Sequence, residues 1–227
     1  MNMNNTPLRR IVGCTLILAI AASCGKKSSD TDAPATPSQD SATVRYVVTS
    51  SNRTGGLVNW TSARGAGKQV AFKANGTSRV EVYKYTFINA DLYTTGYEVA
   101  SVRVPAGSFT NVEFNYQMIP SRDPALQLVG TYTANGVSTP VKVNIDQFAE
   151  IATQLPTASF TGGTTYKALI NLDLAAITNG ITATNLNNAA RTNNEIVIAY
   201  YSNPALLQTI INNINNVMRH SVTLSAD

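Results

Sequence analysis

Apolar and polar side chains alternate strictly from residue 110 to residue 118, and this alternation constrains the fold more than any other feature of the chain. The apolar set is Val112, Phe114, Tyr116 and Met118, and the polar set between them is Asn111, Glu113, Asn115 and Gln117. Successive side chains of a strand point to opposite faces, so one face suits a core and the other suits water. The pattern predicts a half-buried antiparallel strand.

The same alternation recurs on both sides of an Asn-Gly pair, over residues 126–132 and 137–145. Asn135 and Gly136 both tolerate the positive φ that a type I′ turn needs, so this region predicts a tight β-hairpin. Pro140 has no N–H to donate. We therefore expect the second strand to lie at a sheet edge or to bend there.

Weaker alternation predicts strands at 43–49, 57–61, 69–73, 78–88, 98–104, 165–174 and 195–201. Many short strands separated by turn residues are typical of a sandwich or a barrel. About 180 residues fall within the usual size of one domain. We therefore expect residues 43–227 to form a single, mainly β domain, an antiparallel β-sandwich.

One segment near the end of the chain follows helical spacing instead. Its apolar residues are Leu206, Leu207, Ile210, Ile211, Ile214, Val217 and Met218. Asn203 is placed to cap and Pro204 suits the first helical position, which predicts one amphipathic helix over 204–218. The opposite face carries asparagines rather than lysines, unlike a helix that lies on a membrane: Asn212, Asn213, Asn215 and Asn216. We expect the helix to pack on the sheet.

The first 24 residues have the parts of a secretory signal. Arg9 and Arg10 precede an apolar run over 11–22, and small residues lead to Cys24. A membrane-spanning helix needs about 20 apolar residues, and this run is shorter. We therefore expect residues 1–23 to be a signal peptide.

The cysteine directly after Ala-Ala-Ser resembles the lipobox of bacterial lipoproteins. The resemblance implies that the chain is cut before Cys24 and that Cys24 is acylated, which would anchor the protein in a membrane. No aspartate follows the cysteine directly, which by the same resemblance favours the outer membrane, with the periplasmic and the surface leaflet both open. Residues 24–42 are small, polar or proline, as in a flexible tether.

Charge and cysteine content argue against several classes of protein. The chain has 17 Lys and Arg and 13 Asp and Glu, and loss of Arg9 and Arg10 with the signal would leave an excess of two positive charges. The basic residues are scattered and form no stripe for nucleic acid. Cys14 would leave with the signal, so Cys24 would be the only cysteine and no disulfide is expected. We expect the released domain to be a monomer.

The run from Val102 to Phe109 contains Pro105-Ala106-Gly107 and leads into the alternating strand. It resembles the strand–turn–strand element of transthyretin-like β-sandwiches, although Phe109 stands where that pattern has tyrosine. Together with the lipobox and the closing helix, the whole chain resembles lipoproteins of uncharacterised function in Bacteroidota. The resemblance implies a transthyretin-like or immunoglobulin-like sandwich and assigns no catalytic or ligand-binding residue.

Residues for catalysis are scarce. His220 is the only histidine, and no nucleophile elbow, phosphate loop or zinc motif is present. The carboxylates are widely spaced, and the sequence does not bring any two together: Asp91, Glu98, Glu113, Asp123, Asp146 and Asp173. We expect no enzymatic activity, no metal site and no cofactor.

Aromatic side chains are the best candidates for binding, because exposed rings can stack on sugars. The candidates are Trp60, Tyr83, Tyr85, Tyr93 and Tyr97. Tyr83 and Tyr85 share one strand face, opposite Val80 and Val82. The alternative is that these rings pack the sandwich. The polar stretch 179–194 is either functional or mobile.

These features support two functional hypotheses. The first is a lipid-anchored, non-catalytic module that binds a glycan or a protein partner. The second is a pilin-like subunit that is cut near Arg45, loses a strand and assembles by strand exchange. For Arg45, the alternative is a plain outward-facing residue of the first strand.

Overall fold

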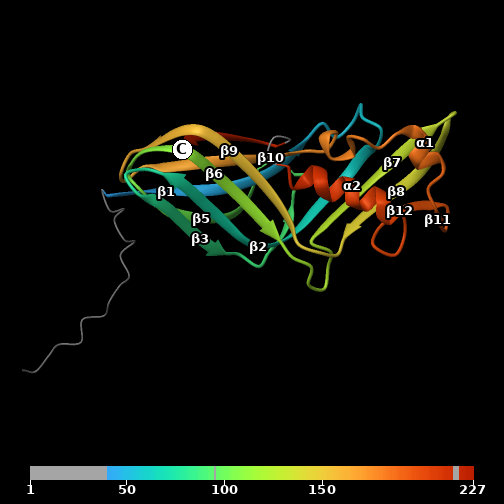
Figure 1. Ribbon diagram of the computed structural model, residues 1–227, viewed down its shortest axis with the longest axis horizontal. Coiled ribbons are helices and arrows are strands. Elements are labelled where there is room, and N and C mark those ends of the chain that lie inside the picture. Colours follow the sequence, from blue (N-terminus) through green and yellow to red (C-terminus); the bar gives the residue numbers. More distant parts are fainter. Residues whose placement is uncertain (1–39, 95, 217–219) are drawn as a thin grey trace, which may run out of the picture. The chain divides into compact units, whose positions relative to one another are not determined.

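Two β-sheets make up most of the computed structural model, which describes residues 40–94, 96–216 and 220–227 (Figure 1). The first sheet has the order β13-β10-β1-β5. Its strands are β1 (Ser41–Ser51), β5 (Tyr97–Pro105), β10 (Thr165–Asp173) and β13 (Ser221–Ala226). β1 pairs with β10 in parallel and with β5 antiparallel, so the first strand of the domain lies inside this sheet.

The second sheet is organised around one long strand, β2 (Asn59–Asn75), in the order β11-β12-β8-β7-β2-β6-β9. Its other strands are β3 (Arg79–Tyr85), β4 (Asn89–Asp91), β6 (Gly107–Met118), β7 (Leu126–Ala134), β8 (Val137–Ile145), β9 (Ala149–Phe160), β11 (Arg191–Thr192) and β12 (Glu195–Ile198). The first part of β2 pairs with β7 and β4, and its second part pairs with β6 and β3.

The predicted break between strands 57–61 and 69–73 is wrong, because β2 runs through it without interruption. Gly65 and Gly67 lie between the two predicted strands, and both make room for side chains of β6. An added β-carbon would lie 2.7 Å from the Met118 sulfur at Gly65 and 2.5 Å from the Tyr116 hydroxyl at Gly67.

Aromatic rings from both sheets meet in the core. Tyr46 of β1 lies 5.9 Å from Phe114 of β6, and Phe72 of β2 lies 5.7 Å from Phe114 and 5.6 Å from Phe160. All four are buried. The mainly β sandwich is therefore confirmed, but its sheets are mixed, since β1–β10 and β8–β12 pair in parallel.

The predicted hairpin is present between β7 and β8. Asn135 and Gly136 have φ of 50° and 76°, as a type I′ turn requires. β12 pairs with residues 141–143 of β8, so Pro140 lies just outside this pairing. The Pro105-Ala106-Gly107 turn also joins two strands, but it carries the chain from one sheet to the other.

The C-terminal helix α2 (Pro204–Ile214) is shorter than predicted and buries Leu207, Ile210, Ile211 and Ile214. It packs against the 3₁₀ turn η1 (Ala176–Thr178) and against β8, β9 and β12, which confirms its core role. Val217 and Met218 lie outside the described residues. No helix within the described ranges is long and apolar enough to cross a membrane.

Two asparagines of this region have other roles than predicted. Asn203 precedes the helix but makes no side-chain cap. Its amide bonds the backbone N–H and carbonyl of Ala190 and the carbonyl of Val197 instead. Asn213 lies on the buried face rather than the wet one, and its Nδ2 donates to the carbonyls of Ile177 at 2.9 Å and Asn179 at 2.8 Å.

Several elements were missed from the sequence: β4, β9, β11, β13, η1 and α1 (Ala183–Asn187). α1 and β11 lie in the polar stretch 179–194, which is therefore partly regular. A capping box between Thr182 and Asn185 starts α1, and Leu186 is buried. β1 also begins at Ser41, two residues before the expected domain boundary.

Candidate binding face

Trp60 and Tyr93 do not form an exposed binding surface. Trp60 is buried, and its Nε1 donates to the Leu174 carbonyl at 3.1 Å. Tyr93 is half-buried; its hydroxyl donates to the Trp60 carbonyl at 3.1 Å, and the Arg53 guanidinium lies 4.2 Å from its ring centre. The prediction that Trp60 offers a stacking surface is wrong, because β2 turns this ring into the core.

Tyr83 and Tyr85 do lie together on the solvent face of β3, with 47% and 59% of their surface exposed. Val80 and Val82 pack against the core from the other face, as the alternation predicted. Tyr97 is also exposed but begins β5, in the four-stranded sheet. The structure thus brings Tyr83 and Tyr85 to one face and leaves Trp60 and Tyr93 elsewhere.

Phe87 extends this pair and was missed from the sequence. It is 70% exposed, has a positive φ of 47°, and its ring stacks on Tyr85 with centroids 5.7 Å apart and planes 6° apart. The period-two spacing of 83, 85 and 87 was the available signal. We call these three residues the aromatic row.

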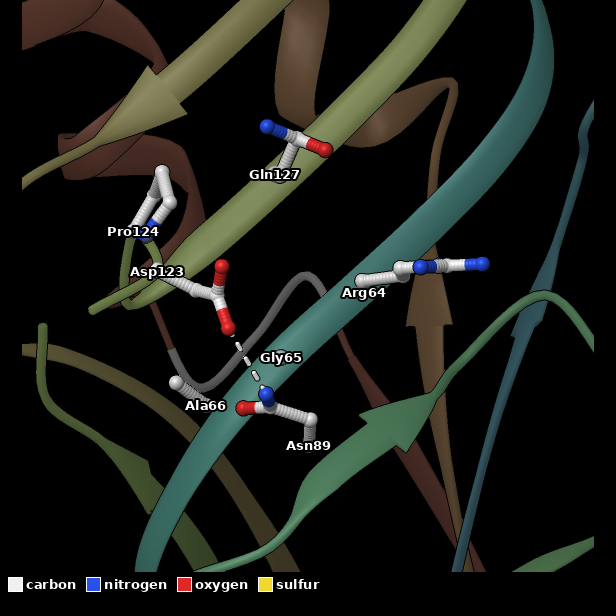
Figure 2. A pocket seen from close by; sticks show the side chains of 7 residues that line it. All are labelled: Arg64, Gly65, Ala66, Asn89, Asp123, Pro124 and Gln127. Atoms are coloured by element: carbon white, nitrogen blue, oxygen red, sulfur yellow. Dashed lines mark hydrogen bonds between the residues drawn. The ribbon is translucent and has the colours of Figure 1, made fainter. Parts of the chain in front are cut away.

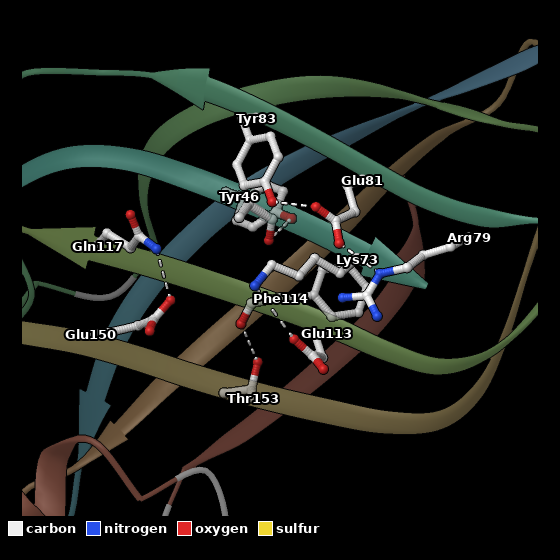
Figure 3. A network of polar contacts seen from close by, with 11 residues as sticks. Tyr46, Lys73, Arg79, Glu81, Tyr83, Glu113, Phe114, Gln117, Glu150 and Thr153 are labelled. Carbon is white, nitrogen blue, oxygen red and sulfur yellow. Dashed lines mark hydrogen bonds and ion pairs between the residues drawn. The ribbon is translucent and has the colours of Figure 1, made fainter. Parts of the chain in front are cut away.

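A polar network lies beside the aromatic row on the outer face of β3, β2, β6 and β9 (Figure 3). The Tyr83 hydroxyl donates to Glu81 at 2.5 Å, and Arg79 Nε donates to the other Glu81 oxygen at 2.6 Å. The hydrogen bond from Tyr83, and after it the one from Arg79, lowers the pKa of Glu81. The same bond to Glu81 raises the pKa of Tyr83. The network holds the Tyr83 side chain in one orientation.

Farther across the same face, a hollow of about 260 Å³ opens between β2, β6 and β9. Its lining residues are Lys73, Glu113, Asn115, Glu150, Ala152 and Gln154. Lys73 Nζ lies 4.0 Å from Glu113, and Gln117 Nε2 donates to Glu150 at 3.0 Å. We call this concavity the Asn115 hollow.

A smaller notch of about 90 Å³ lies where β4 meets β2 and the loop before β7 (Figure 2). Asn89 Nδ2 donates to Asp123 there at 2.8 Å. Arg64 points away from Asp123 in Figure 2, so the notch has no opposed pair of charges. Its volume suits a few water molecules.

Several of the carboxylates singled out in the sequence make separate structural contacts. Asp91 accepts from the hydroxyl and N–H of Thr94 and from the Tyr93 N–H, and these bonds, led by the hydroxyl, lower its pKa. Asp173 accepts from the N–H groups of Ala175 and Ala176. Across the described residues, no three His, Cys, Asp or Glu side chains lie close enough to hold a metal ion.

Arg45 is a half-exposed residue of β1, and its guanidinium connects residues on both sides of that strand. Its Nη2 lies 2.7 Å from Glu98 of β5, and Nη1 contacts Asp227, which follows β13. The peptide bond after Arg45 therefore lies within an interior strand of the sheet.

Comparison with protein-family models, with curated proteins and with solved structures finds no match for this chain.

Proposed function

We propose that the protein is a non-catalytic binding module and that the aromatic row is its contact surface. The observation that carries this proposal is the stacked pair of Tyr85 and Phe87, which exposes 59% and 70% of its surface. Exposed aromatic rings that gather into one patch are candidates for a contact surface, whereas single exposed rings are common. Tyr83 and Tyr85 of β3 and Phe87 just after it form such a patch.

A glycan is the ligand class that this surface favours. Sugar rings have flat apolar faces that stack on aromatic rings and hydroxyl groups that need hydrogen-bond partners. The aromatic row offers the rings, and Arg79, Glu81 and Lys73 on the same outer face offer donors and acceptors. A stable protein partner would cover a larger area than three rings provide.

Retention on insoluble polysaccharides tests the proposal. The wild-type domain should be retained on at least one of glucan, mannan, chitin and peptidoglycan, and the double variant Tyr85→Ala/Phe87→Ala should elute. Tyr200→Ala/Tyr201→Ala is the matched control, because these rings are 80% and 72% exposed in another part of the chain. Equal retention of both variants would show that the aromatic row does not bind the polysaccharide. If Tyr85→Ala/Phe87→Ala loses binding only to a protein ligand, the ligand is a protein rather than a glycan.

We also propose that Cys24 anchors this module in the outer membrane. The support is the signal-like sequence before Cys24 and the polar stretch that separates it from β1. Cys24→Ala should leave an unprocessed precursor that incorporates no labelled palmitate. Lipid labelling of that variant would contradict the proposal. Protease treatment of intact cells distinguishes the surface leaflet from the periplasmic one.

Strand exchange is the second candidate, and the position of β1 supports it. Residues 43–45 pair with β10 on one side, and residues 41–45 pair with β5 on the other. Removal of this segment after a cut at Arg45 would leave two open strand edges facing each other, which is the geometry that an incoming strand needs. Heat-sensitive ladders on a native gel that disappear in Arg45→Ala would support assembly, and a single species would support the binding module.

A further inference from the structure

We propose that the Asn115 hollow is a subsite for one ring of a neutral saccharide. The inference rests on the proposed function, since it places a second contact for the same ligand on the face that carries the aromatic row. It adds the chemical class of the ligand and the residues that distinguish it.

One residue that lines the hollow, Asn115, carries a buried polar atom that lacks a partner. Asn115 is only 4% exposed although it points to the outer face of β6, and its Oδ1 has no hydrogen-bond partner among the described residues. Buried polar atoms are normally paired, so an unpaired acceptor marks a place where a donor is missing. The Oδ1 atom is closed to solvent in this conformation, so a sugar hydroxyl can donate to it once the Asn115 amide turns toward the hollow.

A small residue on the neighbouring edge strand leaves the space open. Ala71 of β2 and Ala152 of β9 are the register partners of Asn115, and Ala152 lines the hollow. A larger side chain at position 152 would fill the surface beside the amide. The resulting volume of about 260 Å³ suits one sugar ring rather than a polymer segment.

The rim supplies both donors and acceptors. Lys73 and Glu113 are only loosely paired at 4.0 Å, so their side chains can turn toward a ligand. Glu150 is oriented by Gln117 on the opposite side. Hydroxyl groups match this mixed set, because each can donate to a carboxylate and accept from an ammonium or amide. Because the rim carries two carboxylates and only one lysine, its negative charge repels an anionic sugar.

The aromatic row lies at a suitable separation from the hollow. Tyr83, Ala71, Asn115 and Ala152 form one row across β3, β2, β6 and β9. Two strand spacings of about 4.8 Å separate β3 from β6, so the Tyr83 and Asn115 backbones lie about 10 Å apart. An oligosaccharide that stacks on the aromatic row can therefore place a nearby ring in the hollow.

Filling the hollow tests the inference. The probes are neutral hexasaccharides of glucose, mannose and galactose, a hexagalacturonate as the anionic arm, and Ca²⁺ alone, each titrated by calorimetry and by NMR of the Asn115 side-chain amide. Ala152→Phe should weaken binding of a neutral probe at least tenfold. Thr157→Phe, at an exposed position of the same edge strand outside the hollow, should leave the Kd within twofold.

The outcomes separate the hollow from the aromatic row. If Tyr85→Ala/Phe87→Ala abolishes binding and Ala152→Phe leaves it unchanged, the hollow is not a subsite, although the proposed function holds. Tighter binding of hexagalacturonate, a shift of the Asn115 amide by Ca²⁺ alone, or no binding of the three neutral probes would overturn the inference. In the last case, retention on insoluble polysaccharide still tests the aromatic row separately.

Discussion

The Tyr116 ring lies directly against Gly67, at the point where the strand β2 passes from one set of neighbours to the other. A β-carbon on Gly67 would fall 2.5 Å from the Tyr116 hydroxyl oxygen, which itself donates to the Gly65 carbonyl at 3.4 Å. Tyr116 is fully buried, and burial raises the pKa of its hydroxyl. The ring and the glycine therefore depend on each other for a close-packed β2–β6 contact.

Gly67→Ala should destabilise the domain by about 1–3 kcal/mol, because overpacking forces a buried ring or the backbone to move. Urea denaturation measures the change. Gly56→Ala is the control, since its added β-carbon would meet its nearest neighbour at an ordinary 3.6 Å. We expect that variant to change stability by less than about 0.5 kcal/mol. Equal stabilities of the two variants would contradict the packing at Gly67.

Gly136→Val should cost at least about 1–2 kcal/mol, because the residue must hold a φ of 76° with a β-branched side chain. No atom lies within 4 Å of the added β-carbon, so the cost comes from the backbone conformation alone. Gly136→Asn should recover most of the stability, since asparagine tolerates this conformation. Thermal denaturation compares the two variants, and equal losses would argue against the type I′ turn.

Ile210→Asp should destabilise the domain by more than about 3 kcal/mol, because it places an unpaired charge on the buried face of α2. Asn212→Asp should change stability by less than about 0.5 kcal/mol, since Asn212 is exposed and keeps an acceptor for Gln208. Chemical denaturation measures both. The reverse order would mean that the apolar face of α2 points to solvent.

Asn213→Ala should cost about 1–3 kcal/mol, because it removes the donor to two carbonyls, those of Ile177 and Asn179. Asn212→Ala is the matched control one residue away on the exposed face. Hydrogen exchange of the amides in and after η1 should rise in the first variant and not in the second. Unchanged exchange in Asn213→Ala would show that this amide does not hold η1 in place.

The Glu81–Tyr83 bond predicts a pH effect at low pH. The pKa of Glu81 is lowered in the folded protein, so the bond stabilises the fold above the ordinary glutamate pKa of about 4.3. This contribution is lost as pH falls through the lowered pKa. Tyr83→Phe should raise the pKa of Glu81, as NMR titration of its carboxyl carbon would show, whereas Tyr85→Phe should leave it unchanged.

The sequence predicts which residues share a face because a strand repeats every two residues. The structure confirms three such predictions. They are the inward side chains of β6, the placement of Tyr83 and Tyr85 opposite Val80 and Val82, and the Asn135-Gly136 turn. Each depends on neighbours within a few positions of the chain. β9 and β13 were missed because small and polar residues weaken their alternation.

Tertiary structure alone decided what covers each face. Trp60 was a candidate for an exposed aromatic, yet it is buried and its Nε1 donates to the Leu174 carbonyl. Asn115 lies on an outer face but is almost fully buried. The role of Gly65 and Gly67 depends on Met118 and Tyr116, which pack against them from another strand. Local periodicity orients side chains, whereas burial depends on strands that meet from distant parts of the chain, and these pairings leave no short-range pattern.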